Sequence, residues 1–207
     1  MAEAHNLQTP QYDAVVIGAG FAGLYQLHCL QQMALSTTVL EAGSNVGGTW
    51  YWNRYPGART DSPSNVYQFL FSDELFNEWQ WSERFPSQAE TERYLNWVAD
   101  RLNLRPNIQF NKRVRSAIWS AENACWLITS EDGSQVSARF VISCMGPLST
   151  PVIPEIDGQE TFSGTIVHTT QWPQEDIELS GKRVGVIGTG ATGIQVVQTI
   201  ASEVQSL

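Results

Sequence analysis

Two glycine-rich segments of this chain have the spacing that cradles the diphosphate of a dinucleotide. The first reads Gly18-Ala-Gly20-Phe-Ala-Gly23, and the second reads Gly188-Thr-Gly190-Ala-Thr-Gly193. In such a loop the first glycine permits a tight turn and the second lets the backbone approach the pyrophosphate. The third allows the following helix to pack closely on the strand. Two such loops predict two dinucleotides held face to face, which is the arrangement for reducing a flavin with a nicotinamide.

The elements around the first loop form a βαβ pattern. A short apolar run from Tyr12 to Ile17 predicts a buried parallel strand, 24–33 predicts a helix, and 37–40 predicts a second strand. The helix start offers unpaired N–H groups to phosphates. Glu41 follows the second strand, where its carboxylate can accept hydrogen bonds from ribose hydroxyls and repel a 2′-phosphate. This site therefore favours FAD or NAD over NADP.

The next segment favours FAD over NAD. Gly47 and Gly48 would let the backbone run beside a cofactor, and aromatic residues follow that could enclose a flavin and exclude water. These aromatic residues are Trp50, Tyr51, Trp52 and Tyr55. Ordinary core packing is the alternative for each of them. Asp61 or Ser62 could also cap a short helix with Pro63 in its first turn.

The second loop has the same surroundings as the first. The segment 182–187 predicts a short apolar strand, and 194–204 predicts a helix. Together they predict a second phosphate cradle. The residue that would select NADPH or NADH belongs to the next strand, which is expected beyond Leu207.

The middle of the chain is expected to complete the first domain. The aromatic-rich segment 69–85 is expected to be helical or irregular. Ser87 and Glu90 form a capping box for a helix that Pro106 ends. The core face of this helix is expected to hold Tyr94, Leu95, Trp97, Val98 and Leu102.

Three strands follow, at 108–118, 125–130 and 136–144, with turn signals at Asn123 and at Asp132-Gly133. They predict a β-meander whose last strand returns to the first domain at Met145-Gly146. Prolines 147, 151 and 154 then mark a linker. The predicted fold is α/β, Rossmann-like and binds two dinucleotides. A FAD-binding domain over 1–150 precedes 151–207, which holds a linker and the first βα unit of a second, incomplete nicotinamide-dinucleotide-binding domain.

Composition narrows the class of protein. The chain of 207 residues is 42% hydrophobic and 16% charged, with a formal net charge of −9. These values favour a globular protein and disfavour nucleic acid or anionic membranes as partners. Cys29, Cys125 and Cys144 are isolated, so neither a metal site nor the redox-active pair of a flavin disulfide reductase is expected. No apolar run reaches membrane-spanning length, and the segment 1–11 lacks a secretion pattern, which predicts a cytoplasmic protein.

A string between the two loops carries a family resemblance. It matches the pattern Phe-x-Gly-x-x-x-His-Thr-x-x-Trp, followed by Pro or Asp, at every fixed position: Phe162, Gly164, His168, Thr169, Trp172 and Pro173. With the segment 47–61, it makes the chain resemble the type I Baeyer–Villiger monooxygenases from Tyr12 onward. Members of that family use FAD and NADPH and exceed twice this length. The resemblance therefore implies an N-terminal part that is inactive by itself.

The resemblance assigns roles to individual residues. FAD would be bound by Gly18, Gly20, Phe21, Ala22, Gly23, Glu41, Gly48, Thr49, Trp50, Tyr51, Trp52, Tyr67, Val114 and Gly146. Arg59, Thr60 and Asp61 match a segment near the flavin that also touches the nicotinamide. NADPH would be bound by Gly188, Thr189, Gly190, Ala191, Thr192 and Gly193. His168 and Trp172 are linked in the family to domain motion and cofactor positioning, whereas the residues alone leave a structural role open.

The implied reaction is hydride transfer from NADPH to FAD, followed by reaction with O₂ to a flavin C4a-peroxide that converts a ketone to an ester or lactone. Asp61 matches an aspartate paired with a catalytic arginine, which is expected beyond Leu207. A complementing C-terminal portion is therefore a possible partner. Two alternatives stay open: a flavin monooxygenase that oxidises sulfides or amines, and a non-catalytic FAD-binding module. The sequence does not identify the ketone, the oligomeric state or whether the chain retains FAD.

Overall fold

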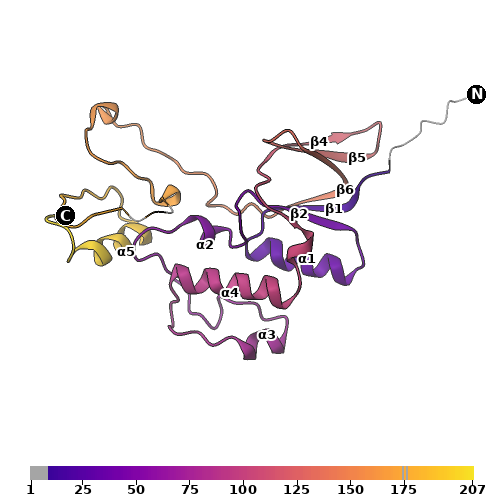
Figure 1. Cartoon of the computed structure of the whole chain (residues 1–207), viewed down its shortest axis with the longest axis horizontal. Helices are drawn as coiled ribbons and strands as arrows, with labels where there is room; N and C mark the ends of the chain where they lie inside the picture. The colour runs from indigo at the N-terminus through magenta and orange to yellow at the C-terminus, as the bar shows by residue number, and fades with distance from the viewer. Residues whose placement is uncertain (1–8, 174, 176) are drawn as a thin grey trace, which may run out of the picture. The chain divides into compact units, whose positions relative to one another are not determined.

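The computed structural model describes residues 9–173, 175 and 177–207. The first eight residues of the N-terminal segment, on which the secretion prediction partly rests, lie outside this range. The described residues form two compact units (Figure 1). The first unit comprises the chain up to Gly48 together with Leu95–Gly146, and the second comprises Thr49–Tyr94 and Pro147–Leu207. No helix of the described chain is both long and apolar enough to cross a membrane.

The first unit contains a six-stranded sheet in the order β3-β2-β1-β6-β5-β4 (Figure 1). β1 (Tyr12–Ile17) and β2 (Thr37–Leu40) have the predicted bounds, and they pair in parallel. β6 (Gln135–Ser143) pairs in parallel with β1 and antiparallel with β5 (Cys125–Ser130). The predicted meander and its return to the first strand are confirmed. The mixed sheet also confirms the α/β, Rossmann-like fold class.

The single strand predicted over 108–118 is wrong. The structure has a short β3 (Ile108–Gln109), which pairs with β2, and a separate β4 (Val114–Ser120), which pairs with β5. Asn111 lies between them with φ +57, in the left-handed region. A residue in that conformation cannot continue a pleated strand, so the chain turns from one edge of the sheet to the other.

Helix α1 (Phe21–Gln32) covers the sheet beside β1 and β2, as Figure 1 shows. It begins three residues before the predicted start, directly from the glycine loop. Leu24, Leu27 and Leu30 repeat at helical spacing and are buried. The helix contacts both β1 and β2, in which the paired residues Val16 and Val39 are fully buried on one face of the sheet.

Helix α4 (Gln88–Arg101) begins as predicted but ends differently. Ser87 Oγ accepts the Glu90 N–H at 3.3 Å, which is half of a capping box. The Glu90 carboxylate instead accepts from the N–H and Oγ of Ser82, both at 2.7 Å. At the other end, Asn103 (φ +50) stops the helix, and Pro106 lies in the 3₁₀ turn η1 (Arg105–Asn107). Three of the predicted core residues, Tyr94, Leu95 and Val98, are fully buried.

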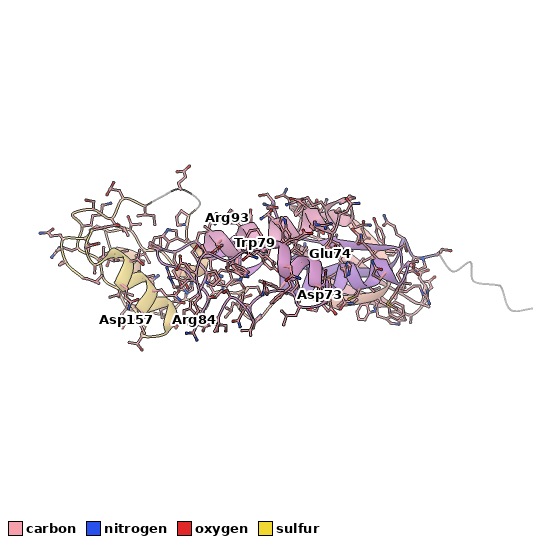
Figure 2. All side chains as sticks on the ribbon, turned by 90° about the horizontal axis from the view of Figure 1, so that it is seen from below. Asp73, Glu74, Trp79, Arg84, Arg93 and Asp157 are labelled. Carbon is pink, nitrogen blue, oxygen red and sulfur yellow. The ribbon has the colours of Figure 1, made fainter. Side chains whose placement is uncertain are left out.

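The second unit is built from short elements. They are α2 (Thr49–Trp52), α3 (Asp73–Glu78), the 3₁₀ turns η2 (Gln159–Thr161) and η3 (Thr169–Gln171), and α5 (Ala191–Ile200). Ser72 caps α3, and Asp73 and Glu74 stand in its first turn, where acidic groups suit the helix dipole (Figure 2). No helix begins directly after Asp61 or Ser62, because 64–66 form only a turn. The possible capping role of Asp61 or Ser62 is therefore wrong.

Two predictions near the second glycine loop are corrected. The segment 182–187 is not a regular strand: one parallel bridge joins Arg183 to Ser206, and Val184 N–H donates to the Ser206 carbonyl at 2.9 Å. A strand requires a ladder of such bonds along its length, and here the ladder is one bridge long. α5 ends at Ile200, before the predicted end at 204, so that 203–206 can run beside 181–184.

Candidate dinucleotide-binding sites

The first glycine loop connects β1 to α1 through a turn that only glycine accommodates. Gly18 has φ +101, and a Cβ on it would lie 2.7 Å from the Cys144 carbonyl oxygen. A Cβ on Gly23 would lie 1.8 Å from the Gly18 carbonyl oxygen. The first and third glycines therefore have the turning and packing roles that their spacing predicts.

Gly20 has a close neighbour that the sequence did not indicate. A Cβ on Gly20 would lie 3.3 Å from the Gly48 Cα, and one on Gly48 would lie 2.8 Å from the Gly20 Cα. The Gly47 N–H also donates to the Ala19 carbonyl at 3.0 Å. The segment 43–48 thus packs directly on the first glycine loop, and both glycines allow the two backbones to meet.

Glu41 links these two segments with its carboxylate. It is only 3% exposed; its Oε2 accepts from the Ala19 N–H at 2.6 Å, and its Oε1 accepts from the Gly43 N–H at 2.7 Å. Each carboxylate oxygen has a further lone pair. The residue is therefore anchored by the backbone and can still accept a hydrogen bond from a ribose hydroxyl.

The starts of α1 and α5 differ from those of α3 and α4. Ser72 and Ser87 cap α3 and α4 with their side-chain oxygens. Gly20 and Gly190 precede α1 and α5, and neither helix has a side-chain cap or an acidic residue in its first turn. Amide groups at such a start are satisfied by water or by a ligand, and the positive end of the helix dipole favours phosphate. Both helix starts therefore fit a dinucleotide diphosphate.

The chain also brings Val114 toward the end of β2 in the first unit. The Lys112 N–H donates to the Glu41 carbonyl at 2.8 Å, and the Asn111 N–H donates to the Gly43 carbonyl at 2.9 Å. These bonds hold the segment leading to Val114 beside Glu41. Gly146 follows β6 with φ +74 and is exposed.

In the second unit, α2 is fixed by polar contacts to the first turns of α4. The Gln88 side-chain amide donates to the Trp50 carbonyl and, at 3.0 Å, to Glu92. Arg54 pairs with Glu92 at 2.5 Å and donates from Nε to the Tyr51 carbonyl at 2.9 Å. This network orients the short aromatic helix that the sequence assigns to the flavin.

The aromatic side chains of α2 form two edge-to-face pairs. Trp50 packs on Tyr67 with ring centroids 5.6 Å apart, and its Nε1–H donates to the Tyr67 hydroxyl at 3.1 Å. Tyr51 and Trp52 lie 4.8 Å apart, and Trp52 is 37% exposed. Trp50 thus has the core role left open by the sequence, whereas Trp52 presents its ring at the surface.

Burial raises the pKa of Tyr67, and the nearby negative charge of Asp61 raises it further, while the hydrogen bond from Trp50 acts in the opposite direction. Tyr67 therefore keeps its proton at neutral pH and stays a hydrogen-bond donor as well as an acceptor.

The segment 58–60 is held as an extended strand-like piece. Arg59 bridges to Ser87, Thr60 N–H donates to the Pro86 carbonyl at 3.0 Å, and Gln88 N–H donates to the Ala58 carbonyl at 2.8 Å. Thr60 is buried, whereas Asp61 is exposed and follows at the end of this piece. The Arg59 side chain forms an exposed ion pair with Glu83 at 3.0 Å.

The second glycine loop repeats the packing of the first. A Cβ on Gly193 would lie 2.6 Å from the Gly188 carbonyl oxygen, which matches the relation of Gly23 to Gly18. A contact that the sequence does not predict lies beside this loop. The Tyr55 hydroxyl donates to Oε1 of Gln195 on helix α5 at 2.8 Å. Their separation along the chain left no local pattern by which to find the contact.

The string from Phe162 to Trp172 is largely exposed. A Cβ on Gly164 would lie 2.5 Å from Cε1 of the Phe162 ring. Because Gly164 has no side chain, the ring can fold back over the chain at this point. His168 precedes η3 and its Nδ1 lies 2.8 Å from the Thr170 hydroxyl. Trp172 is half-buried at the other end of η3.

Comparison with known proteins shows the family. A model of flavin-binding monooxygenase-like proteins matches residues 12–206. The chain belongs to this family. It is 50% identical over 201 residues to an acetone monooxygenase (methyl acetate-forming) of Gordonia sp. strain TY-5, covering 97% of this chain and 38% of that protein. Because acetone is a ketone and methyl acetate an ester, this relative confirms the resemblance to Baeyer–Villiger monooxygenases.

Two further likenesses agree with this family membership. The chain is 46% identical over 187 residues to the phenazine N-monooxygenase PhzNO1 of Lysobacter antibioticus, covering 90% of this chain and 34% of that protein. A structure of oxidized steroid monooxygenase bound to NADP superimposes with a TM-score of 0.88 at 49% identity, covering 94% of this chain and 37% of that one. The chain therefore spans little more than a third of the length of these relatives.

Proposed function

We propose that this chain is the N-terminal part of a Baeyer–Villiger monooxygenase that oxidises ketones to esters or lactones with NADPH and O₂. The observation that carries the proposal is the complete string from Phe162 to Trp172 between two uncapped glycine-loop helices. The identity of 50% to an enzyme that forms methyl acetate supports the same reaction class.

FAD would lie on the first glycine loop. The N–H groups of Phe21, Ala22 and Gly23 at the start of α1 would bind its diphosphate, and Glu41 would accept from its ribose. The remaining proposed contacts are Gly18, Gly20, Gly48, Thr49, Trp50, Tyr51, Trp52, Tyr67, Val114 and Gly146. When bound, FAD supplies the ring that accepts a hydride and activates oxygen. The chain's contribution is to orient that ring and, with the aromatic side chains of α2, to keep water from it.

NADPH would lie on the second glycine loop, with its diphosphate at the start of α5. The proposed contacts are Gly188, Thr189, Gly190, Ala191, Thr192 and Gly193. Arg59, Thr60 and Asp61 would meet the nicotinamide side, and Asp61 is the proposed catalytic residue of this chain. Its exposure and its place at the end of an extended segment leave its carboxylate able to pair with an arginine.

The remaining predictions follow from family membership and length. The fingerprint residues, Phe162, Gly164, His168, Thr169 and Trp172, would position the cofactors. The domain division at 150 and the cytoplasmic location stay predictions. By itself, the chain of 207 residues is expected not to turn over a ketone. A C-terminal portion of the same enzyme would supply the catalytic arginine and most of the substrate pocket.

The activity is tested with the whole gene product, NADPH, isotopically labelled O₂ and a panel of small ketones. The proposal expects one labelled oxygen atom in an ester or lactone. Asp61→Ala is expected to lower the rate of ester formation, whereas Asp157→Ala, which changes an exposed acid in the second unit, should leave it unchanged. Consumption of NADPH with no labelled ester from any ketone would refute the proposal.

A second candidate function is oxygenation of a nitrogen or sulfur atom. The observation that favours it is the 46% identity to a phenazine N-monooxygenase. The same assay separates the two functions when aromatic N-heterocycles and sulfides are added to the panel. Formation of an N-oxide or sulfoxide without any ester would favour this second candidate.

A further inference from the structure

Helix α5 is docked on the segment 55–59 by a single amide side chain that uses both of its ends. The Tyr55 hydroxyl donates to Gln195 Oε1 at 2.8 Å, and Gln195 Nε2 donates to the Arg59 carbonyl at 3.1 Å. Gln195 thereby ties the helix to two points of the segment at once. Both partners belong to the second unit, in which Figure 1 shows α5 beside the chain that follows α2.

Gly57 lies between these two points and lets the helix approach closely. Its φ is +77, and a Cβ on it would lie 2.1 Å from Thr199 Oγ1 and 2.6 Å from the Gln195 carbonyl oxygen. Any other residue at this position would push α5 away. The bonds of Gln195 therefore act at a contact where two backbones already touch, and a shift of the helix would break both of them.

Helix α5 and the segment 55–59 each adjoin a segment that is proposed to bind the nicotinamide cofactor. α5 starts at Ala191, at the end of the second glycine loop, and Gln195 lies one turn further along the helix. Tyr55 also reaches into the first turn, with its hydroxyl 3.4 Å from Thr192 Oγ1. On the other side, backbone pairing to 86–88 holds the segment 58–60 in place, and Asp61 follows directly after it.

We infer that Gln195 is a positioning residue for the nicotinamide cofactor. It sets the start of α5, which would bind the diphosphate, at a fixed distance from the segment 59–61, which would meet the nicotinamide. This inference rests on the proposed function. A dinucleotide binds at both ends simultaneously only if the two ends of its site keep that distance, so loosening the contact reduces affinity without removing any group that touches the ligand.

The test measures NADPH and FAD dissociation constants by calorimetry for the whole gene product and its variants. Gln195→Ala removes both hydrogen bonds and is expected to weaken NADPH binding about tenfold, with FAD affinity changed less than about twofold. Gln198→Ala is the matched control, because Gln198 is the same residue type on the same helix and is exposed. It should leave both constants unchanged.

A double-mutant cycle with Tyr55→Phe identifies the contact itself. Because Gln195→Ala already removes the acceptor of the Tyr55 hydroxyl, adding Tyr55→Phe should weaken NADPH binding by less than it does in the wild type. Hydrogen exchange of the α5 amides in the absence of NADPH should rise in Gln195→Ala and not in Gln198→Ala.

The outcomes separate this inference from the proposed function. A wild-type protein that binds NADPH, with a Gln195→Ala variant that binds it equally well, would overturn the inference and leave the function standing. Loss of FAD affinity in parallel with NADPH affinity would show a general structural role and would also overturn it. A wild-type protein that binds no NADPH would overturn the proposed function and this inference together.

Discussion

Glu41 joins two loops of the first unit through one buried carboxylate. The residue was predicted from its place after the second strand, because an acidic residue about twenty positions beyond a glycine loop is typical of a dinucleotide site. The bonds to Ala19 and Gly43 could not be predicted, since they depend on how 43–48 folds back onto the glycine loop. The contact of Gly20 with Gly48 could not be predicted either, because it also depends on how these two segments fold against each other.

The change Glu41→Gln tests the anchoring role. An amide can accept only one of the two backbone N–H groups, so the other is left buried and unsatisfied, which costs about 1–3 kcal/mol of stability. Urea unfolding should show this loss, and FAD affinity should fall with it. Glu122→Gln, on an exposed turn, is the control and should change the unfolding free energy by less than about 0.5 kcal/mol. Equal midpoints for the two variants would contradict the anchoring role.

Tyr94 is expected to make the stability of the folded protein depend on pH in the alkaline range. Its side chain is fully buried, and burial raises its pKa from 10.0 to about 12. The unfolded chain therefore loses this proton at a lower pH than the folded protein does. Stability is fully present below pH 10 and is lost as the pH rises toward 12, by about 2–3 kcal/mol in all.

The measurement compares the unfolding free energies of the wild type and Tyr94→Phe between pH 8 and pH 12. The variant should be less stable at pH 8, because the Phe69 N–H loses the Tyr94 hydroxyl as its acceptor. The difference between the two proteins should shrink as the pH rises above 10. A difference that stays constant over this range would show that Tyr94 does not titrate as described.

At the scale of elements, strands with strong apolar patterns were predicted well, and irregular backbone was not. β1 and β2 have the predicted bounds because fully buried parallel strands are continuous apolar runs. The break at Asn111 was missed because it accompanies backbone bonds from Asn111 and Lys112 to residues 43 and 41, which lie far away in the sequence. The strand predicted at 182–187 failed for another reason: its apolar pattern is strand-like, but pairing reaches only 181–184.

Asn111 offers a test of that break. Asn111→Val places a β-branched residue in the left-handed conformation and should destabilise the protein by about 1–3 kcal/mol. Asn111→Gly is the matched control, because glycine accepts φ +57 without strain, and it should unfold within about 0.5 kcal/mol of the wild type. Thermal unfolding of the two variants measures the difference. A valine variant as stable as the glycine variant would contradict a strained break between β3 and β4.

At the scale of the whole molecule, two glycine-loop helices of similar construction lie in two different units. The first unit contains a continuous sheet with its loop and acidic residue in place. In the second, the loop and α5 are present, and Gln195 and Gly57 attach them to the segment that precedes Asp61. This division predicts that binding of the FAD diphosphate and ribose depends on the first unit and that NADPH binding depends on contacts within the second.

FAD binding by the protein tests the central claim most directly. Calorimetric titration with FAD and with FMN should show tight FAD binding and FMN binding at least about tenfold weaker, because FMN lacks the AMP half, whose ribose Glu41 would hold and whose phosphate the start of α1 would bind. The purified protein should be yellow. A protein that stays colourless after soaking in excess FAD, or that binds FMN as tightly as FAD, would contradict the account.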